Sequence, residues 1–100
     1  IKLGVATVGG AKGVISHAVR YANERRQFNT PIAHFGAIKH KLGEMAAKVY
    51  ASESASYRAG QNIDDLIEDL KAKGIPDAEA KLKALEQFAI ECAIMKVHGS

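Results

Sequence analysis

Residues 21–32 read YANERRQFNTPI, a helix end that runs directly into a tight loop. Arg25 and Arg26 place positive charge on the last helical turn, where the free backbone carbonyls carry partial negative charge. Pro31 biases Thr30 towards extended geometry, so the first helix cannot continue through this point. The stretch therefore predicts a sharp turn between two long helices.

Apolar residues recur every three or four positions on both sides of this loop, which is the pattern of amphipathic helices. Gly74 and Pro76 stop one helical segment, and Asn62 followed by acidic residues is typical of a helix start. These signals predict an all-α fold, an antiparallel up-and-down helical bundle, in a single domain over residues 1–100. The expected helices span about residues 2–26, 35–60, 63–73 and 78–98.

Composition argues against several classes of function. Of the 100 residues, 47% are hydrophobic and 25% are charged, and the net charge is +3. Charges of both signs are dispersed, whereas nucleic-acid binding favours a basic face interleaved with aromatic residues. The lone Cys92 cannot form an internal disulfide. The apolar N-terminal stretch is interrupted by Lys12 and His17, so no membrane span is predicted and a cytoplasmic protein is expected.

The two ends of the chain lie within helical patterns. The sequence begins at Ile1 without a methionine, and it ends at Ser100 without a clear helix-terminating signal. We therefore expect a piece excised from a longer chain. An incomplete bundle leaves an apolar face uncovered, which predicts a homo-oligomer, a dimer or larger, in solution.

The segment Glu24–Phe28 has the pattern Glu-Arg-x-x-Phe and is followed by a short loop and a second long helix. This arrangement resembles the C-terminal helical domain of the acyl-CoA dehydrogenases, flavoenzymes that introduce a double bond between the α and β carbons of an acyl-CoA. The resemblance implies a parent enzyme that uses FAD, acts on fatty acyl-CoA in β-oxidation and passes electrons to an electron-transferring flavoprotein. The piece would supply FAD contacts and oligomer packing. A flavin-dependent acyl-CoA oxidase and a non-enzymatic helical interaction module are the alternatives.

Three residues of this segment are the candidate cofactor-binding residues. By resemblance, Arg25 contacts the pyrophosphate of FAD, and a guanidinium suits a diphosphate because it offers paired donors in a rigid fork. Gln27 would offer hydrogen bonds, and Phe28 would supply an apolar wall near the dinucleotide. From the residues alone, the competing explanation is that Arg25 and Arg26 cap the helix and that Phe28 anchors the core.

Two further features make the resemblance closest to the very-long-chain branch. Gly36 stands where many members carry a glutamine that reaches the FAD of a neighbouring subunit, so that contact is absent here. The Phe35-Gly36 pair and the ending Lys96–Ser100 are similar to the very-long-chain branch.

No catalytic residue is predicted within the chain. The family's reaction needs a glutamate that removes the α-proton, and the family positions for it fall outside residues 1–100. The resemblance therefore implies that the piece alone is inactive and has little affinity for FAD. The four histidines lack the spacing of metal ligands, so no metal site is predicted.

Overall fold

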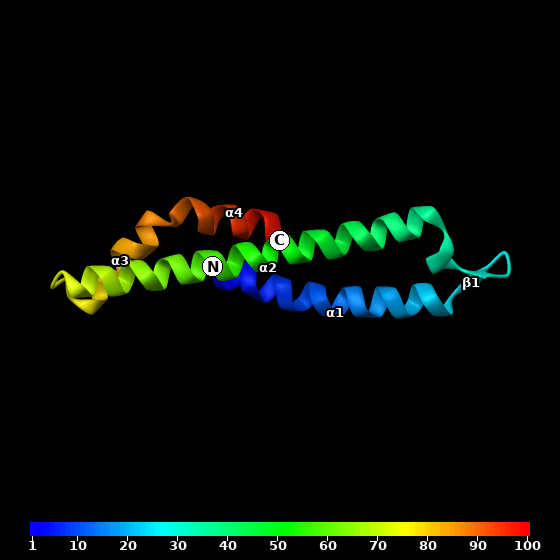
Figure 1. The fold of residues 1–100 in the computed structure, drawn as a ribbon, viewed down its shortest axis with the longest axis horizontal. Coiled ribbons are helices and arrows are strands. Elements are labelled where there is room, and N and C mark those ends of the chain that lie inside the picture. The colour runs from blue at the N-terminus through cyan, green and yellow to red at the C-terminus, as the bar shows by residue number, and fades with distance from the viewer.

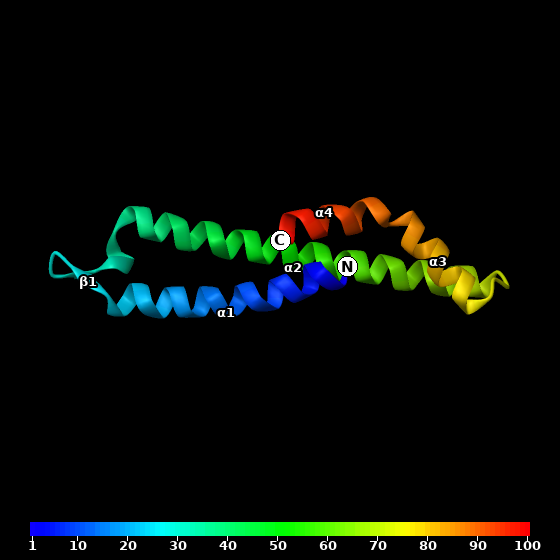
Figure 2. The same cartoon turned by 180° about the vertical axis from the view of Figure 1, so that it is seen from behind.

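The computed structural model describes residues 1–100 and contains four α-helices and one short hairpin (Figure 1). Helix α1 runs antiparallel to the first half of α2, and α3 and α4 fold back along the second half of α2 (Figure 1, Figure 2). The molecule is a rod with extents of 68 × 17 × 16 Å, and its helical content confirms the predicted all-α class. The elements are α1 (Lys2–Glu24), β1 (Arg26–Gln27), β2 (Thr30–Pro31), the 3-10 turn η1 (Ile32–His34), α2 (Gly36–Ala72), α3 (Asp77–Gln87) and α4 (Ala89–Gly99).

Helix α1 ends at Glu24, two residues before the predicted end at residue 26. Arg25 is extended, with φ −70° and ψ 125°, and its carbonyl accepts a hydrogen bond from the Ile32 N–H at 2.8 Å. Arg26 then pairs with Pro31 in the antiparallel ladder of β1 and β2. The hairpin therefore uses the residues that a longer helix would have occupied.

The predicted helices over residues 35–60 and 63–73 are wrong as separate elements, because α2 is continuous from Gly36 to Ala72. Asn62 lies inside α2 and does not begin a helix. Ala59 and Ile63, on either side of it, are 5% and 6% exposed, on the face of α2 that packs against the other helices. Burial of this continuous face outweighs the preference of Asn for a helix start.

The predicted single helix over residues 78–98 is also wrong, because the chain bends at Phe88 and forms α3 and α4. Phe88 has φ −104° and ψ 24°, although its N–H still bonds the Ala84 carbonyl at 3.2 Å. Helix α3 packs along α2, whereas α4 packs against both α1 and α2. The bend redirects α4 towards α1, and no glycine or proline lies at Phe88 to mark it.

The core is small because the rod is only a few helices wide. Ala80 and Ala84 are 0% exposed, and their small side chains let α3 lie close to α2. Gly4 serves the same purpose between α1 and α4, since a Cβ at this position would lie 3.3 Å from the Met95 Cβ. The buried residues are Gly4, Val8, Ala22, Ser56, Ala59, Ile63, Ala80, Ala84 and Met95. None of the helices combines the length and apolar character needed to cross a membrane.

A backbone cap ends α2 before the turn into α3. Gly74 adopts φ 87°, a left-handed conformation that suits glycine. The Ile75 N–H bonds the Leu70 carbonyl at 3.2 Å, and the Gly74 N–H bonds the Lys71 carbonyl at 3.0 Å. These two bonds form a Schellman cap, so the stop predicted at Gly74 is confirmed.

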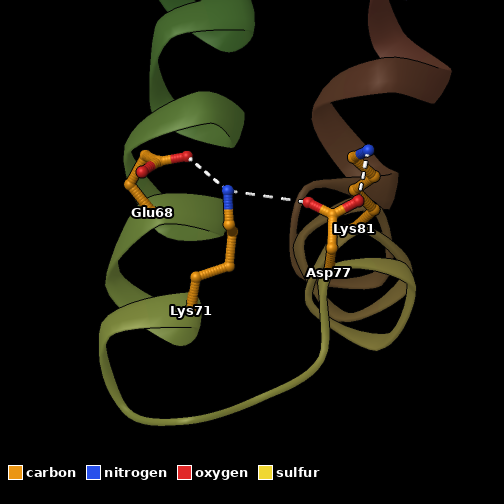
Figure 3. A network of polar contacts seen from close by, with 4 residues as sticks. All are labelled: Glu68, Lys71, Asp77 and Lys81. Atoms are coloured by element: carbon orange, nitrogen blue, oxygen red, sulfur yellow. Dashed lines mark hydrogen bonds and ion pairs between the residues drawn. The ribbon is translucent and has the colours of Figure 1, made fainter.

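Four charged side chains join the two sides of this turn (Figure 3). Lys71 Nζ lies 3.2 Å from a Glu68 carboxylate oxygen and 3.7 Å from one of Asp77, and Lys81 Nζ lies 2.6 Å from the other Asp77 oxygen. The hydrogen bond from Lys81 is the main reason that the pKa of the Asp77 carboxyl lies below its ordinary value. The hydrogen bond to Glu68 is the main reason that the pKa of Lys71 is raised. All four side chains are well exposed, so solvent screens the network.

Candidate functional site

The hairpin of β1 and β2 projects from the end of the rod where α1 ends and α2 begins (Figure 1). Gln27 pairs with Thr30, which leaves Phe28 and Asn29 as a two-residue turn. Both turn residues have positive φ, 50° and 61°, as in the type I′ turns of tight hairpins. Asn tolerates this conformation, whereas Phe costs of order 1 kcal/mol or more. A turn with only a structural role would be more stable with Gly or Asn at this position, so the Phe28 side chain is a candidate for a binding role.

The two adjacent arginines have different surroundings. The Arg26 Nη2 donates a hydrogen bond to the Asn29 carbonyl at 2.7 Å and thereby fastens the turn. Arg25 bonds the Tyr21 carbonyl through its backbone N–H at 2.8 Å, and its exposed side chain forms neither an ion pair nor a side-chain hydrogen bond. Neither guanidinium forms a hydrogen bond to a carbonyl of α1. The Arg25 guanidinium is left free.

Phe28 is 87% exposed and is not the core anchor of the competing explanation. Its ring meets the ring of Phe35 edge to face, with centroids 6.4 Å apart and an interplanar angle of 80°. The Gln27 side chain is exposed on the adjoining strand. The structure therefore brings the three predicted residues, Arg25, Gln27 and Phe28, onto a single exposed hairpin.

Positive charge is concentrated at this end of the rod. Residues 20–41 comprise the end of α1, the hairpin, η1 and the start of α2. They contain five Lys and Arg side chains and one carboxylate, Glu24. The remainder of the chain contains nearly equal numbers of both signs. The chain order disperses these five cations over 22 residues, and only the hairpin brings them to one end. Such a surface attracts anions.

The chemistry of this site fits the phosphate end of a dinucleotide. A free guanidinium matches the bidentate geometry of a phosphate, the Gln27 amide supplies both a donor and an acceptor, and the Phe28 ring offers an apolar face. All three side chains are exposed, so by themselves they do not enclose the ring systems of a dinucleotide. No group of three or more His, Cys, Asp or Glu side chains is placed to hold a metal ion.

Curated proteins of known class resemble this chain along almost its whole length. A family model described as "Acyl-CoA dehydrogenase, C-terminal domain" matches residues 1–100. The probable acyl-CoA dehydrogenase of Bacillus subtilis (strain 168) is 42% identical over 99 residues, which cover 99% of this chain and 17% of that protein. The mitochondrial very long-chain specific acyl-CoA dehydrogenase of Bos taurus is 36% identical, with 98% of this chain and 12% of that protein covered. The caffeyl-CoA reductase-Etf complex subunit CarC of Acetobacterium woodii is 35% identical, with 98% and 26% covered.

A solved structure shares both sequence and fold with this chain. The acyl-CoA dehydrogenase of Bacillus anthracis, determined in complex with FAD, is 43% identical and superposes with a TM-score of 0.86. The match covers 98% of this chain and 17% of that one. This chain therefore spans only a minor part of the length of its relatives.

Proposed function

This chain belongs to the acyl-CoA dehydrogenase family, and from that premise we propose that it is part of the C-terminal helical domain of a FAD-dependent fatty acyl-CoA dehydrogenase. The observation that carries the proposal is the free Arg25 guanidinium on a hairpin at the electropositive end of the rod. The Bacillus anthracis relative binds FAD, and the very-long-chain relative supports a fatty acyl-CoA as the substrate.

In the proposed enzyme, the hairpin binds and orients the cofactor but does not react with it. Arg25 would hold the diphosphate with its paired guanidinium donors, and the positive charge of the neighbouring cations would attract the phosphates to this surface. Arg26 holds the turn through the Asn29 carbonyl, and the Phe28 ring at the tip of that turn would supply an apolar wall for the dinucleotide. Bound FAD supplies hydride acceptance, and the α-proton is removed by a carboxylate outside residues 1–100.

The partners follow from the same proposal. The electron acceptor is an electron-transferring flavoprotein, in line with the Etf complex to which the Acetobacterium relative belongs. The chain self-associates through apolar surface that the rod leaves exposed. We place the enzyme in the cytoplasm. The isolated 100 residues neither turn over an acyl-CoA nor hold FAD tightly, since they supply neither the base nor an enclosure for the flavin ring.

The test uses the longer protein that carries this sequence, with the substitution Arg25→Gln. Arg20→Gln is the matched control, because Arg20 is a second exposed cation on the same end of α1. A charge-assisted hydrogen bond contributes about 1.5–3 kcal/mol, so Arg25→Gln should weaken FAD binding about 10- to 150-fold. Arg25→Lys should give an intermediate loss, because it keeps the charge but not the fork. The measurement is FAD dissociation followed by flavin fluorescence.

Equal FAD affinities for Arg25→Gln and Arg20→Gln would refute the role of Arg25. A full-length protein that binds no FAD at all would refute the enzyme and favour a helical interaction module. Oxygen consumption without reduction of an electron-transferring flavoprotein would favour an acyl-CoA oxidase.

A further inference from the structure

Both carbonyls of the hairpin turn accept hydrogen bonds from side chains of the hairpin itself. Phe28 and Asn29 lie between the paired residues of β1 and β2, so their carbonyls are not part of the strand ladder. The Arg26 Nη2 donates a hydrogen bond to the Asn29 carbonyl at 2.7 Å. The Thr30 Oγ1 donates a longer one, of 3.4 Å, to the Phe28 carbonyl. The shorter bond has a charged donor and is the stronger of the two, so Arg26 is the main side-chain restraint on the turn.

This restraint acts on a backbone conformation that is unfavourable for Phe28. The φ angle is 50° at Phe28 and 61° at Asn29. An Asn side chain can form a local hydrogen bond that offsets the left-handed conformation, whereas a Phe side chain cannot. A hydrogen bond from a charged group contributes free energy of the same order as this conformational cost. Loss of the Arg26 bond should therefore let Phe28 return to negative φ for much of the time.

The backbone conformation of Phe28 determines where its ring lies. The ring meets that of Phe35 edge to face, with centroids 6.4 Å apart. Phe35 is fixed to the rod, because it directly precedes α2 and its N–H bonds the Ile32 carbonyl at 3.1 Å. Phe28 is 87% exposed, so the turn, and not burial, sets the position of its ring. The contact between the two rings therefore depends on the turn, and the turn depends on Arg26.

We propose that Arg26 is a positioning residue of the hairpin: it holds the turn in the left-handed conformation that sets the Phe28 ring against Phe35, and it does not bind the phosphates of FAD. The proposal rests on the FAD-binding role proposed above for the hairpin. It gives the two adjacent arginines different tasks. The Arg25 guanidinium is free to bind an anion, whereas Arg26 already donates to the Asn29 carbonyl.

Fluorine NMR of the longer protein, prepared without FAD, tests the effect of Arg26 on the turn. A para-fluorophenylalanine introduced in place of Phe28 alone reports the surroundings of the ring. In the labelled protein, Phe35→Leu gives the signal of a ring that has lost its aromatic neighbour. Arg26→Gln should move the signal most of the way towards this reference, whereas the control Arg20→Gln, at an exposed position of α1, should leave it unchanged. An unchanged signal in Arg26→Gln would overturn the proposal.

The FAD affinity of the longer protein, followed by flavin fluorescence, tests whether this restraint serves the cofactor. Arg26→Gln should weaken FAD binding about three- to tenfold, the effect expected for one hydrogen bond. In a second background, Phe28→Asn with Asn29→Gly, the turn has the sequence Asn-Gly, which adopts type I′ geometry without such a restraint. In that background Arg26→Gln should change the affinity less than about twofold, because the turn no longer needs the arginine.

The two backgrounds separate positioning from direct binding. An equal loss of affinity in both would mean that Arg26 acts on FAD through its own charge, and it would overturn the positioning role. The outcome for Arg25 is distinct. If Arg25→Gln loses no affinity, the proposed function fails, while the fluorine signal still reports whether Arg26 holds the turn.

Discussion

Helix α1 packs closely against α4 at Gly4. Substitutions at Gly4 and at Gly9 should therefore distinguish the effect of this packing on stability from the effect of helix propensity. Gly4 and Gly9 both lie inside α1. A Cβ at Gly9 would meet no atom within 4 Å, whereas one at Gly4 would lie 3.3 Å from the Met95 Cβ and 3.7 Å from the Met95 carbonyl oxygen. The Ser56 Oγ of α2 would also lie 3.6 Å away. Because the nearest atom, the Met95 Cβ, is bonded directly to the α4 backbone, α4 itself must shift to admit the methyl group.

The two substitutions should change the free energy of unfolding in opposite directions. Glycine to alanine in a helix interior gains up to about 1 kcal/mol, and Gly9→Ala should keep most of this gain. Overpacking costs typically about 1–3 kcal/mol, so Gly4→Ala should be net destabilising by about 1 kcal/mol. For a domain of this size, each kcal/mol corresponds to roughly 4–8 °C in Tm.

Urea denaturation followed by circular dichroism, at one fixed protein concentration, measures both variants. The concentration must be fixed because association stabilises the folded state. If Gly4→Ala stabilises the chain as much as Gly9→Ala does, α1 and α4 are not held in the close contact described here.

Two further predictions concern the α2–α3 turn and the hairpin. The pKa of Asp77 is lowered in the folded state, so its contribution to stability is complete above its unfolded pKa and is lost as the pH falls through the folded value. Asp77→Asn should therefore flatten the acid-side dependence of Tm below about pH 4, while an identical slope in wild type and variant would contradict this. Phe28→Asn relieves positive φ at the turn, so it should stabilise the chain by about 1 kcal/mol and yet weaken FAD binding in the longer protein. A variant that binds FAD as tightly as wild type would remove Phe28 from the site.

The site was only partly readable from the chain. The Glu24–Phe28 pattern identified the family and the three candidate residues, because a motif is a local property of the sequence. The sequence did not predict that Arg25 and Arg26 have different surroundings. That difference arises because the hairpin places the Asn29 carbonyl within hydrogen-bonding distance of Arg26 and not of Arg25. The same hairpin brings the five Lys and Arg side chains of residues 20–41 to one end of the rod, although they are spread along the sequence.

Residues with special backbone requirements determined where this chain turns. Pro31 excluded a helix through the hairpin, and Gly74 stopped α2 where a left-handed residue was needed, so the sequence alone predicted both turns and the all-α class. The tertiary structure decided the continuity of α2 through Asn62 and the bend at Phe88. Neither position has a backbone restriction, and the outcome there depends on which faces the neighbouring helices bury. Helix α2 continues beyond Asn62 because its far half packs against α3. The last helical segment bends at Phe88 because α4 packs against α1 as well as α2.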